Sequence, residues 1–141
     1  MNEMTIGELA RRTGLSVKAI REYEARGLMY TVGRSAGNYR LFDESALWCA
    51  QVIAALRAVG LTVKEIEGLA GVYLTRREEP IGPHIAPLLR RAEQRIDERI
   101  AALEDMRRRI HQYRAQNAAA LAGRPGADFA AHDPRRRTHA A

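Results

Sequence analysis

Two basic side chains three positions apart, Lys18 and Arg21, are the residues best suited to recognise another molecule. That spacing puts both on one face of a helix. Their long side chains end in hydrogen-bond donors that can reach N7 and O6 of guanine in a major groove. Arg34 and Arg40 follow along the chain as candidates for phosphate contacts. No paired carboxylates, nucleophile–base motif or phosphate-binding glycine loop accompanies them, so we expect a binding protein and not an enzyme.

The positive charge of the chain is concentrated around these side chains. The 141 residues include 23 Lys and Arg and 17 Asp and Glu, which gives a net charge of +6. Seven basic residues and only two acidic ones lie between residues 11 and 40. A local excess of this kind favours a polyanionic partner.

The element that must position Lys18 and Arg21 is predicted to be a pair of short helices joined by a tight turn. Thr5, with Glu8 three residues later, is a capping box that starts the first helix. Gly14 supplies the turn, and Ser16 caps the second helix. This arrangement indicates a helix-turn-helix whose second helix lies in a major groove. An ordinary antiparallel helix pair with a solvated basic face is the alternative.

A small β-hairpin is predicted immediately after this unit. Residues 28–32 and 38–42 are short runs with β-branched or aromatic residues, and Gly33, Ser35 and Gly37 lie between them. The hairpin would form the wing of a winged helix, with Arg34 and Arg40 on either side of its loop. A solvated hairpin with incidental arginines is the alternative.

Two further helices should complete the small domain. Asp43 caps a helix that runs to about Val59 and is apolar nearly all round, so we expect it to be buried with Trp48 as a core anchor. Gly60 ends that helix. Thr62 then begins a fourth helix with a second capping box, and we expect it to end at Gly71.

A proline-containing linker over residues 73–83 and a long helix over residues 84–122 follow. The helix carries apolar residues at most a and d positions of a heptad, which predicts a coiled coil. One amphipathic helix folded onto its own domain is the alternative, but a helix near 40 residues spans roughly 60 Å, too long for a domain of this size to cover. A partner helix is therefore needed, most simply from a second copy. The a positions are Leu89, Ile96, Leu103, Ile110 and Asn117, and the d positions are Ile85, Ala92, Arg99, Met106 and Tyr113.

Three stretches in order, TIGELARRTGLSVKAIREYEARGL, GNYRLF and LRAVGLTVKEIEGLAG, resemble the DNA-binding domain of the MerR family of transcriptional regulators. The resemblance covers residues 4–72 continuously and extends loosely to about residue 117. It implies a mainly α fold: a winged helix-turn-helix domain over residues 1–72, then a long helix that forms an antiparallel coiled coil. It also implies a homodimer that binds a pseudo-palindromic promoter operator in double-stranded DNA. The dimer would distort that DNA and so act indirectly on RNA polymerase.

The resemblance assigns roles to individual residues. The DNA-binding set comprises Ser16, Val17, Lys18, Arg21, Tyr23, Arg34, Tyr39, Arg40 and Thr62, with Tyr23 and Arg40 on phosphates and the turn over residues 60–62 as a second wing. The dimerisation set comprises Ile85, Leu89, Ala92, Ile96, Leu103, Met106, Ile110 and Tyr113. Two other classes of function stay open: an architectural DNA-binding accessory factor, and an adaptor that binds proteins through its coiled coil.

Glu22 departs from the family pattern, which usually has an aromatic residue before the Tyr-Glu pair of the recognition helix. A carboxylate there can accept a hydrogen bond from cytosine N4 and so change the operator that is read. It can also pair with Arg26 four residues later on the same helix. We expect the pairing with Arg26.

No effector site of a known kind is predicted. Metal-sensing relatives carry a Cys or Ser just before the long helix and Cys residues just after it, whereas Gly82 and Asn117 occupy those positions here. We therefore expect no metal and no cofactor. Cys49, the single cysteine, is expected to be a core thiol, with a redox sensor as the alternative. His84 is expected to be a solvated residue of the first turn of the long helix.

The ends of the chain add little. The start, MNEMTIGEL, has no basic segment followed by an apolar run, and no apolar stretch is long enough to cross a bilayer. We therefore expect a cytoplasmic protein with no membrane partner. Residues 123–141 are rich in Gly, Pro, Ala and charge, and we expect them to be disordered.

Overall fold

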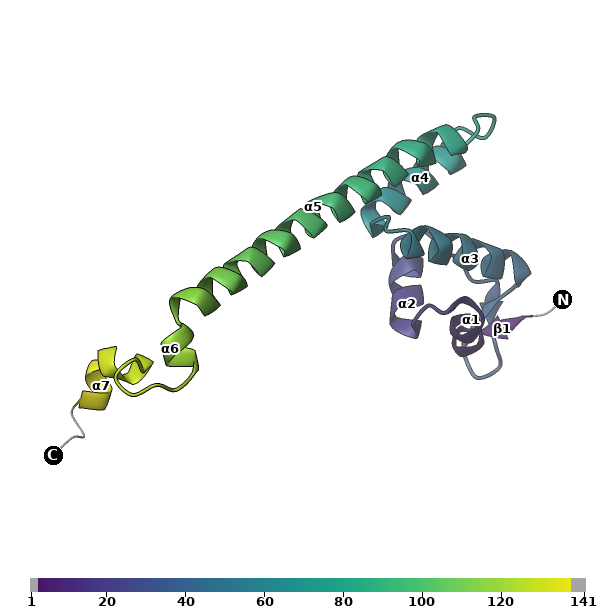
Figure 1. Cartoon of the computed structure of the whole chain (residues 1–141). Coiled ribbons are helices and arrows are strands. Elements are labelled where there is room, and N and C mark those ends of the chain that lie inside the picture. The colour runs from purple at the N-terminus through teal and green to yellow at the C-terminus, as the bar shows by residue number, and fades with distance from the viewer. Residues whose placement is uncertain (1–2, 138–141) are drawn as a thin grey trace. The chain divides into compact units, whose positions relative to one another are not determined.

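The computed structural model describes residues 3–137, which form two compact units that divide within one long helix, between Gln94 and Arg95 (Figure 1). The first unit contains β1 (Met4–Thr5), α1 (Ile6–Thr13), α2 (Val17–Ala25), β2 (Gly33–Arg34), β3 (Arg40–Phe42), α3 (Glu44–Ala58), α4 (Val63–Thr75) and the start of α5 (Gly82–Gln116). The second contains the rest of α5, then α6 (Ala118–Leu121), the 3-10 turn η1 (Phe129–His132) and α7 (Pro134–Arg137).

Local capping begins the first two helices where predicted, although only one half of the capping box predicted at Thr5 and Glu8 is formed. The Thr5 side chain accepts a hydrogen bond from the Glu8 N–H at 3.3 Å, while the Glu8 carboxylate pairs with Arg12. Gly14 adopts a φ of 76°, which lets the chain leave α1 through a left-handed residue. Ser16 then caps α2 by accepting from the Ala19 N–H at 3.0 Å.

The predicted hairpin is part of a three-stranded antiparallel sheet with the order β1-β3-β2. Arg34 of β2 lies opposite Arg40 of β3, and Met4 of β1 lies opposite Phe42. The strands are shorter than the predicted runs because Leu28 and Met29 are buried in the hydrophobic core instead of extending β2. The sheet therefore ties the wing to the residues that begin α1.

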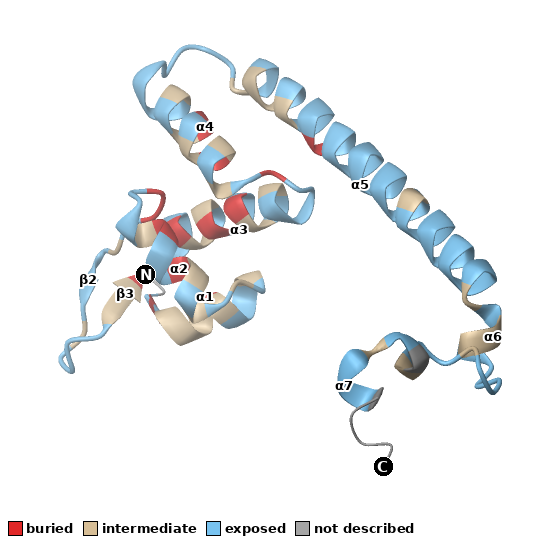
Figure 2. Ribbon diagram, turned by 90° about the vertical axis from the view of Figure 1, so that its left-hand side faces the viewer, coloured by how far each residue is buried: buried red, intermediate tan, exposed pale blue. Residues whose placement is uncertain are grey.

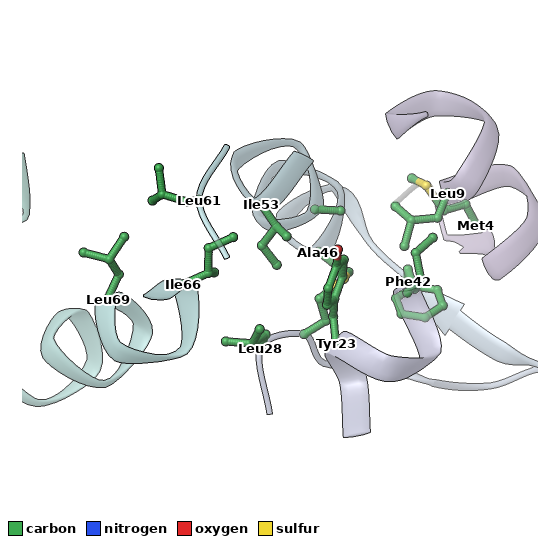
Figure 3. Packing of buried hydrophobic residues seen from close by; sticks show 13 residues of the cluster. Met4, Leu9, Tyr23, Leu28, Phe42, Ala46, Ile53, Leu61, Ile66 and Leu69 are labelled. Atoms are coloured by element: carbon green, nitrogen blue, oxygen red, sulfur yellow. The ribbon is translucent and has the colours of Figure 1, made fainter. Parts of the chain in front are cut away.

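The hydrophobic core lies where α1 to α4 meet β3 (Figure 2). Its fully buried large side chains are Leu9, Ile20, Phe42 and Leu61. Figure 3 shows Met4, Leu9 and Phe42 gathered at one end of the cluster and Ile66 and Leu69 at the other, with Tyr23, Ala46 and Ile53 between them. One continuous core thus holds the two helices of the helix-turn-helix against the helices that follow.

Helix α3 has its predicted bounds, but Trp48 is not a core anchor. The Asp43 carboxylate caps the helix at 2.8 Å, and Gly60 follows it with a φ of 95°. The helix packs on the core through Ala46, Ala50 and Ile53. Trp48 lies two residues after Ala46, about 200° around the helix axis, and is 57% exposed. An all-apolar helix gives no pattern from which its buried face can be chosen, which is why the sequence misplaced Trp48.

Helix α4 forms the predicted capping box and then continues beyond Gly71. Thr62 accepts from the Glu65 N–H at 3.1 Å, and the Glu65 carboxylate accepts from the Thr62 N–H at 2.9 Å. The expected end at Gly71 is wrong, because the helix runs to Thr75. The connection to α5 is therefore residues 76–81, shorter than the linker predicted over residues 73–83.

Helix α5 has 35 residues and ends at Gln116, whereas the sequence predicted a single helix that continued to residue 122. The difference arises at Asn117, which separates α5 from the short α6. Its side-chain amide donates to the Tyr113 carbonyl at 3.0 Å. Asn side chains that bond to nearby backbone compete with the helical ladder, so they favour helix ends.

The start of α5 packs on the first unit. Ala92 is buried and lies close to Gly60. A Cβ added at Gly60 would lie 3.6 Å from the Cβ of Ala92. Ile85 and Leu88 are half-buried against the core cluster. Ala92 was predicted to face a second chain, and that is wrong, because the protein's own chain buries it. Ile85 is only half covered, so its place in the interface stays a prediction.

The rest of α5 exposes a stripe of large apolar side chains, which Figure 2 shows as an almost wholly exposed helix. In the described part of the chain no helix is long and apolar enough to cross a membrane. The predicted disordered segment over residues 123–141 contains the short η1 and α7, and residues 138–141 lie outside the described residues. The exposed stripe on α5 comprises Leu89, Ile96, Ile100, Leu103, Met106, Ile110 and Tyr113.

Candidate nucleic-acid interface

Helix α2 presents basic side chains to solvent while its other face anchors it. Lys18 and Arg21 are exposed, as is the capping residue Ser16, and Val17 is half-buried. Ile20 is fully buried beneath them. The predicted basic face of the second helix is therefore confirmed as an exposed face, held by the core from behind.

Tyr23 belongs to that anchoring face and not to the exposed one. Its side chain is only 4% exposed, and Figure 3 shows its ring beside Leu28 and Ala46. The ring is therefore part of the core, and the expectation that the Tyr23 hydroxyl contacts a phosphate stays a prediction. Its position on α2, three residues after Ile20, continues the buried stripe of an amphipathic helix.

Glu22 pairs with Arg26 as predicted, with 3.0 Å between its Oε1 and Arg26 Nη2. Arg26 also reaches Glu67 of α4, with 2.6 Å between Nη1 and Oε1. Arg26 donates these hydrogen bonds to Glu67 and Glu22, and they raise the pKa of its guanidinium above its ordinary value, with Glu67 the larger cause. This network links α2 to α4, and the link was not predicted because Glu67 lies 41 residues away.

The turn of the wing is built by Asn38 and Gly37. Asn38 has a φ of 64°, a left-handed conformation that Asn tolerates better than most residues. A Cβ at Gly37 would lie 3.0 Å from the Tyr39 ring, so the absence of a side chain lets that ring lie close to the turn. Tyr39 and Arg34 are both exposed, and Arg34 Nη1 donates to the Asn38 carbonyl at 3.1 Å. The turn of the wing therefore offers the Tyr39 ring and the Arg34 guanidinium to solvent.

Arg40 is bound to the recognition helix. Its Nε lies 3.0 Å from Glu24 Oε1, and the two side chains are 38% and 21% exposed. The second oxygen of Glu24, Oε2, is buried and has no hydrogen-bond partner among residues 3–137. The sequence identified Arg40 as a candidate but gave no role to Glu24, because the two residues lie in different elements.

Thr62 is exposed at the turn between α3 and α4, where the resemblance implied a second wing. Its side chain already caps α4, and Arg57 Nη1 donates to the neighbouring Leu61 carbonyl at 2.8 Å. The turn is thus fixed from both of its ends. A rigid exposed turn is well suited to contact a DNA backbone, because little conformational entropy is lost on binding.

A separate cavity of about 310 Å³ lies between α3, α4 and the first turn of α5. Cys49 lines it, and its thiol donates to the Leu28 carbonyl at 3.3 Å. Burial raises the pKa of this thiol, so it is neutral near pH 7, which agrees with the expected core thiol. The lining is apolar apart from the thiol and one hydroxyl: Leu28, Trp48, Cys49, Val52, Ile53, Leu56, Ile66, Leu69, Ala70, Tyr73, Ile81 and Ile85.

Nothing in the described residues gathers three or more His, Cys, Asp or Glu side chains in a geometry for a metal ion. His84, expected to be solvated, instead lies 3.3 Å from Glu79 Oε2 through its Nε2. Arg76 and, to a lesser degree, His84 lower the pKa of Glu79 by hydrogen bonding. These three residues form an exposed polar cluster at the connection before α5.

Comparison with known protein families identifies two matching regions. Residues 4–71 match the family described as MerR HTH family regulatory protein, and residues 50–113 match the family described as MerR, DNA binding. The first match covers the helix-turn-helix, the wing, α3 and most of α4. The second continues along α5. Both descriptions are of DNA-binding regulators and not of enzymes.

Individual relatives agree with these matches. The chain is 36% identical over 100 residues to the HTH-type transcriptional activator SoxR homolog of Chromobacterium violaceum, covering 71% of this chain and 66% of that protein. It is 31% identical over 107 residues to the HTH-type transcriptional regulator HmrR of Sinorhizobium medicae, covering 76% of this chain and 71% of that one.

A solved structure extends the agreement to the fold. The transcription regulator PbrR691 from Ralstonia metallidurans, crystallised with lead(II), superposes with a TM-score of 0.63 at 30% identity. The superposition covers 79% of this chain and 85% of that one, so it includes the long helix as well as the helix-turn-helix domain. On these matches and this geometry, the chain belongs to the MerR family of DNA-binding transcription regulators.

Proposed function

We propose that this protein binds a pseudo-palindromic promoter operator as a homodimer and distorts the DNA to control transcription. The observation that carries the proposal is the exposed basic face of α2, anchored from behind by Ile20 and Tyr23. In this reading Lys18 and Arg21 contact base edges in the major groove. Arg34 and Arg40 in the wing then contact phosphates, which fix register without reading sequence.

The exposed apolar stripe on α5 supports the homodimer. A 35-residue helix is about 52 Å long, and a large exposed apolar stripe on a soluble protein marks an interaction surface. Ala92 is buried and Ile85 is half-buried within the chain, which leaves the exposed stripe that begins at Leu89 and Ile96 for the second copy. Two copies joined through α5 would hold two α2 helices at a fixed separation, so operator symmetry would mirror protein symmetry.

Control of transcription would follow from DNA deformation. A dimer that holds two half-sites can bend or untwist the DNA between them, at an energetic cost repaid by its contacts. RNA polymerase would then be affected indirectly, through the promoter geometry it meets. We place this activity in the cytoplasm, where a bacterial-type promoter regulator acts.

The test is to select operators from random duplex DNA with the full chain and to measure the mass of the complex by light scattering. We expect an enriched motif with two inverted half-sites, bound by two copies of the chain. Binding without an enriched motif would favour an architectural DNA-binding factor and overturn the proposal. Failure to bind DNA at low salt would favour the adaptor reading and would overturn it as well.

A further inference from the structure

The contact between Glu24 and Arg40 joins the two elements that approach DNA. Glu24 lies on α2, and Arg40 is the first residue of β3 in the wing. Their 3.0 Å contact uses Arg40 Nε and Glu24 Oε1. Nε is the inner nitrogen of the guanidinium, so the two outer Nη groups stay available, and the Arg40 side chain has no other polar partner among residues 3–137. A guanidinium held in this way can bind a phosphate without releasing its carboxylate.

The Glu24 carboxylate is placed as a support and not as a surface charge. Its side chain is 21% exposed, and its Oε2 is buried without a hydrogen-bond partner in the described chain. A buried oxygen without a partner costs free energy, so this carboxylate is not placed here for the stability of the fold. Its one polar contact in the described residues is with the wing arginine.

We propose that Glu24 is a positioning residue for DNA binding: it fixes the Arg40 guanidinium so that the wing and the recognition helix reach the duplex in register. The inference rests on the proposed function, since it needs DNA contact by both elements. For substitution of Glu24, it predicts a change in DNA affinity opposite in sign to the change expected from net charge alone. Removal of a negative charge near DNA should strengthen binding, whereas loss of a positioning residue should weaken it.

The expected size follows from the loss of one phosphate contact. Each neutralised phosphate contributes about 0.9 to the slope of log K against log salt, which corresponds to about fivefold in affinity at 0.15 M salt. Glu24→Ala and Arg40→Ala should each weaken operator binding by about fivefold and lower the salt slope by about 0.9. The double variant should lose no more than either single variant, because both remove the same contact.

Three further variants separate positioning from charge and from folding. Glu24→Gln keeps an acceptor oxygen and should restore both affinity and slope. Arg40→Lys keeps the charge but lacks the planar guanidinium that can hold Nε on the carboxylate while both Nη groups face the phosphate, so it should bind the operator more weakly than wild type. Glu8→Ala removes the same charge from another ion pair, with Arg12 on α1, and serves as the matched control with an unchanged slope.

The measurement is a gel-shift or anisotropy titration of the full chain against its selected operator over a series of salt concentrations. Thermal melts establish that each variant is folded, and Arg40→Lys decides the question if Glu24→Ala does not fold. Each of three results for operator affinity would overturn the proposal. Glu24→Ala could bind as tightly as Glu8→Ala, the double variant could bind about 25-fold more weakly than wild type, or Arg40→Lys could bind as tightly as wild type. If wild type itself binds no operator, the proposed function has failed and not this inference alone.

Discussion

The exposed stripe on α5 gives the sharpest prediction: Ile96→Asp combined with Leu103→Asp converts a dimer into a monomer. These side chains are 55% and 51% exposed in the single chain. Full burial of such a side chain contributes about 1.5–3 kcal/mol, so the half still exposed is worth about 1 kcal/mol in an interface. The double substitution affects four side chains in the dimer, so it should remove about 4 kcal/mol of association free energy. That loss raises the dimer dissociation constant about a thousandfold. Burial of the new carboxylates adds to this loss.

The assay is sedimentation or light scattering of full-length protein over about 1–100 µM, a range in which a micromolar dimer loosened a thousandfold would be monomeric. Ala101→Asp with Ala115→Asp is the matched control, because both alanines are exposed and fall at f positions of the heptad, away from the predicted seam. The control should stay dimeric. A double Asp variant that keeps the dimer mass at 10 µM would refute the assignment of this stripe to the interface, as would a wild-type monomer.

Three other predictions follow from individual residues. Arg21→Ala should weaken specific operator binding by about 1–3 kcal/mol, measured by competition gel shift, and wild-type affinity would remove Arg21 from the reading face. Because burial raises the pKa of Cys49, less thiolate exists at pH 7.5, so iodoacetamide should alkylate the folded protein more slowly than the urea-unfolded chain; equal rates would contradict this. Gly71→Ala should raise the free energy of unfolding by about 0.5–1 kcal/mol, since Gly71 lies inside α4 with open space around an added Cβ; a lower melting temperature would contradict it.

Where an element begins and ends was largely readable from the sequence, because capping acts over three or four residues. Ser16 and Thr62 cap helices with N–H groups three positions later, and Gly14 and Gly60 supply left-handed residues after helices. These interactions need no tertiary partner. The resemblance to the MerR family rests on the same ordered local motifs, and the family matches confirm it.

Which face of an element is buried was decided by the tertiary structure wherever the pattern was uniform. Trp48 lies on a helix that is apolar nearly all round, so only packing could place it at the surface. Ala92 fits the heptad as well as Ile96 does, yet the protein's own chain buries it, and Ile85 is half-buried against the core. Periodicity identifies an apolar stripe but does not say which neighbour buries it.

The long-range ion pairs also came only from the tertiary structure. Arg26 meets Glu67 across 41 residues, and Arg40 meets Glu24 across two different elements. A sequence states the charge of such residues but not which of them the fold brings within 3 Å, since that depends on packing of the whole core. The sequence by itself therefore determined the basic recognition helix and its family, while the fold decided what holds that helix and its wing in place.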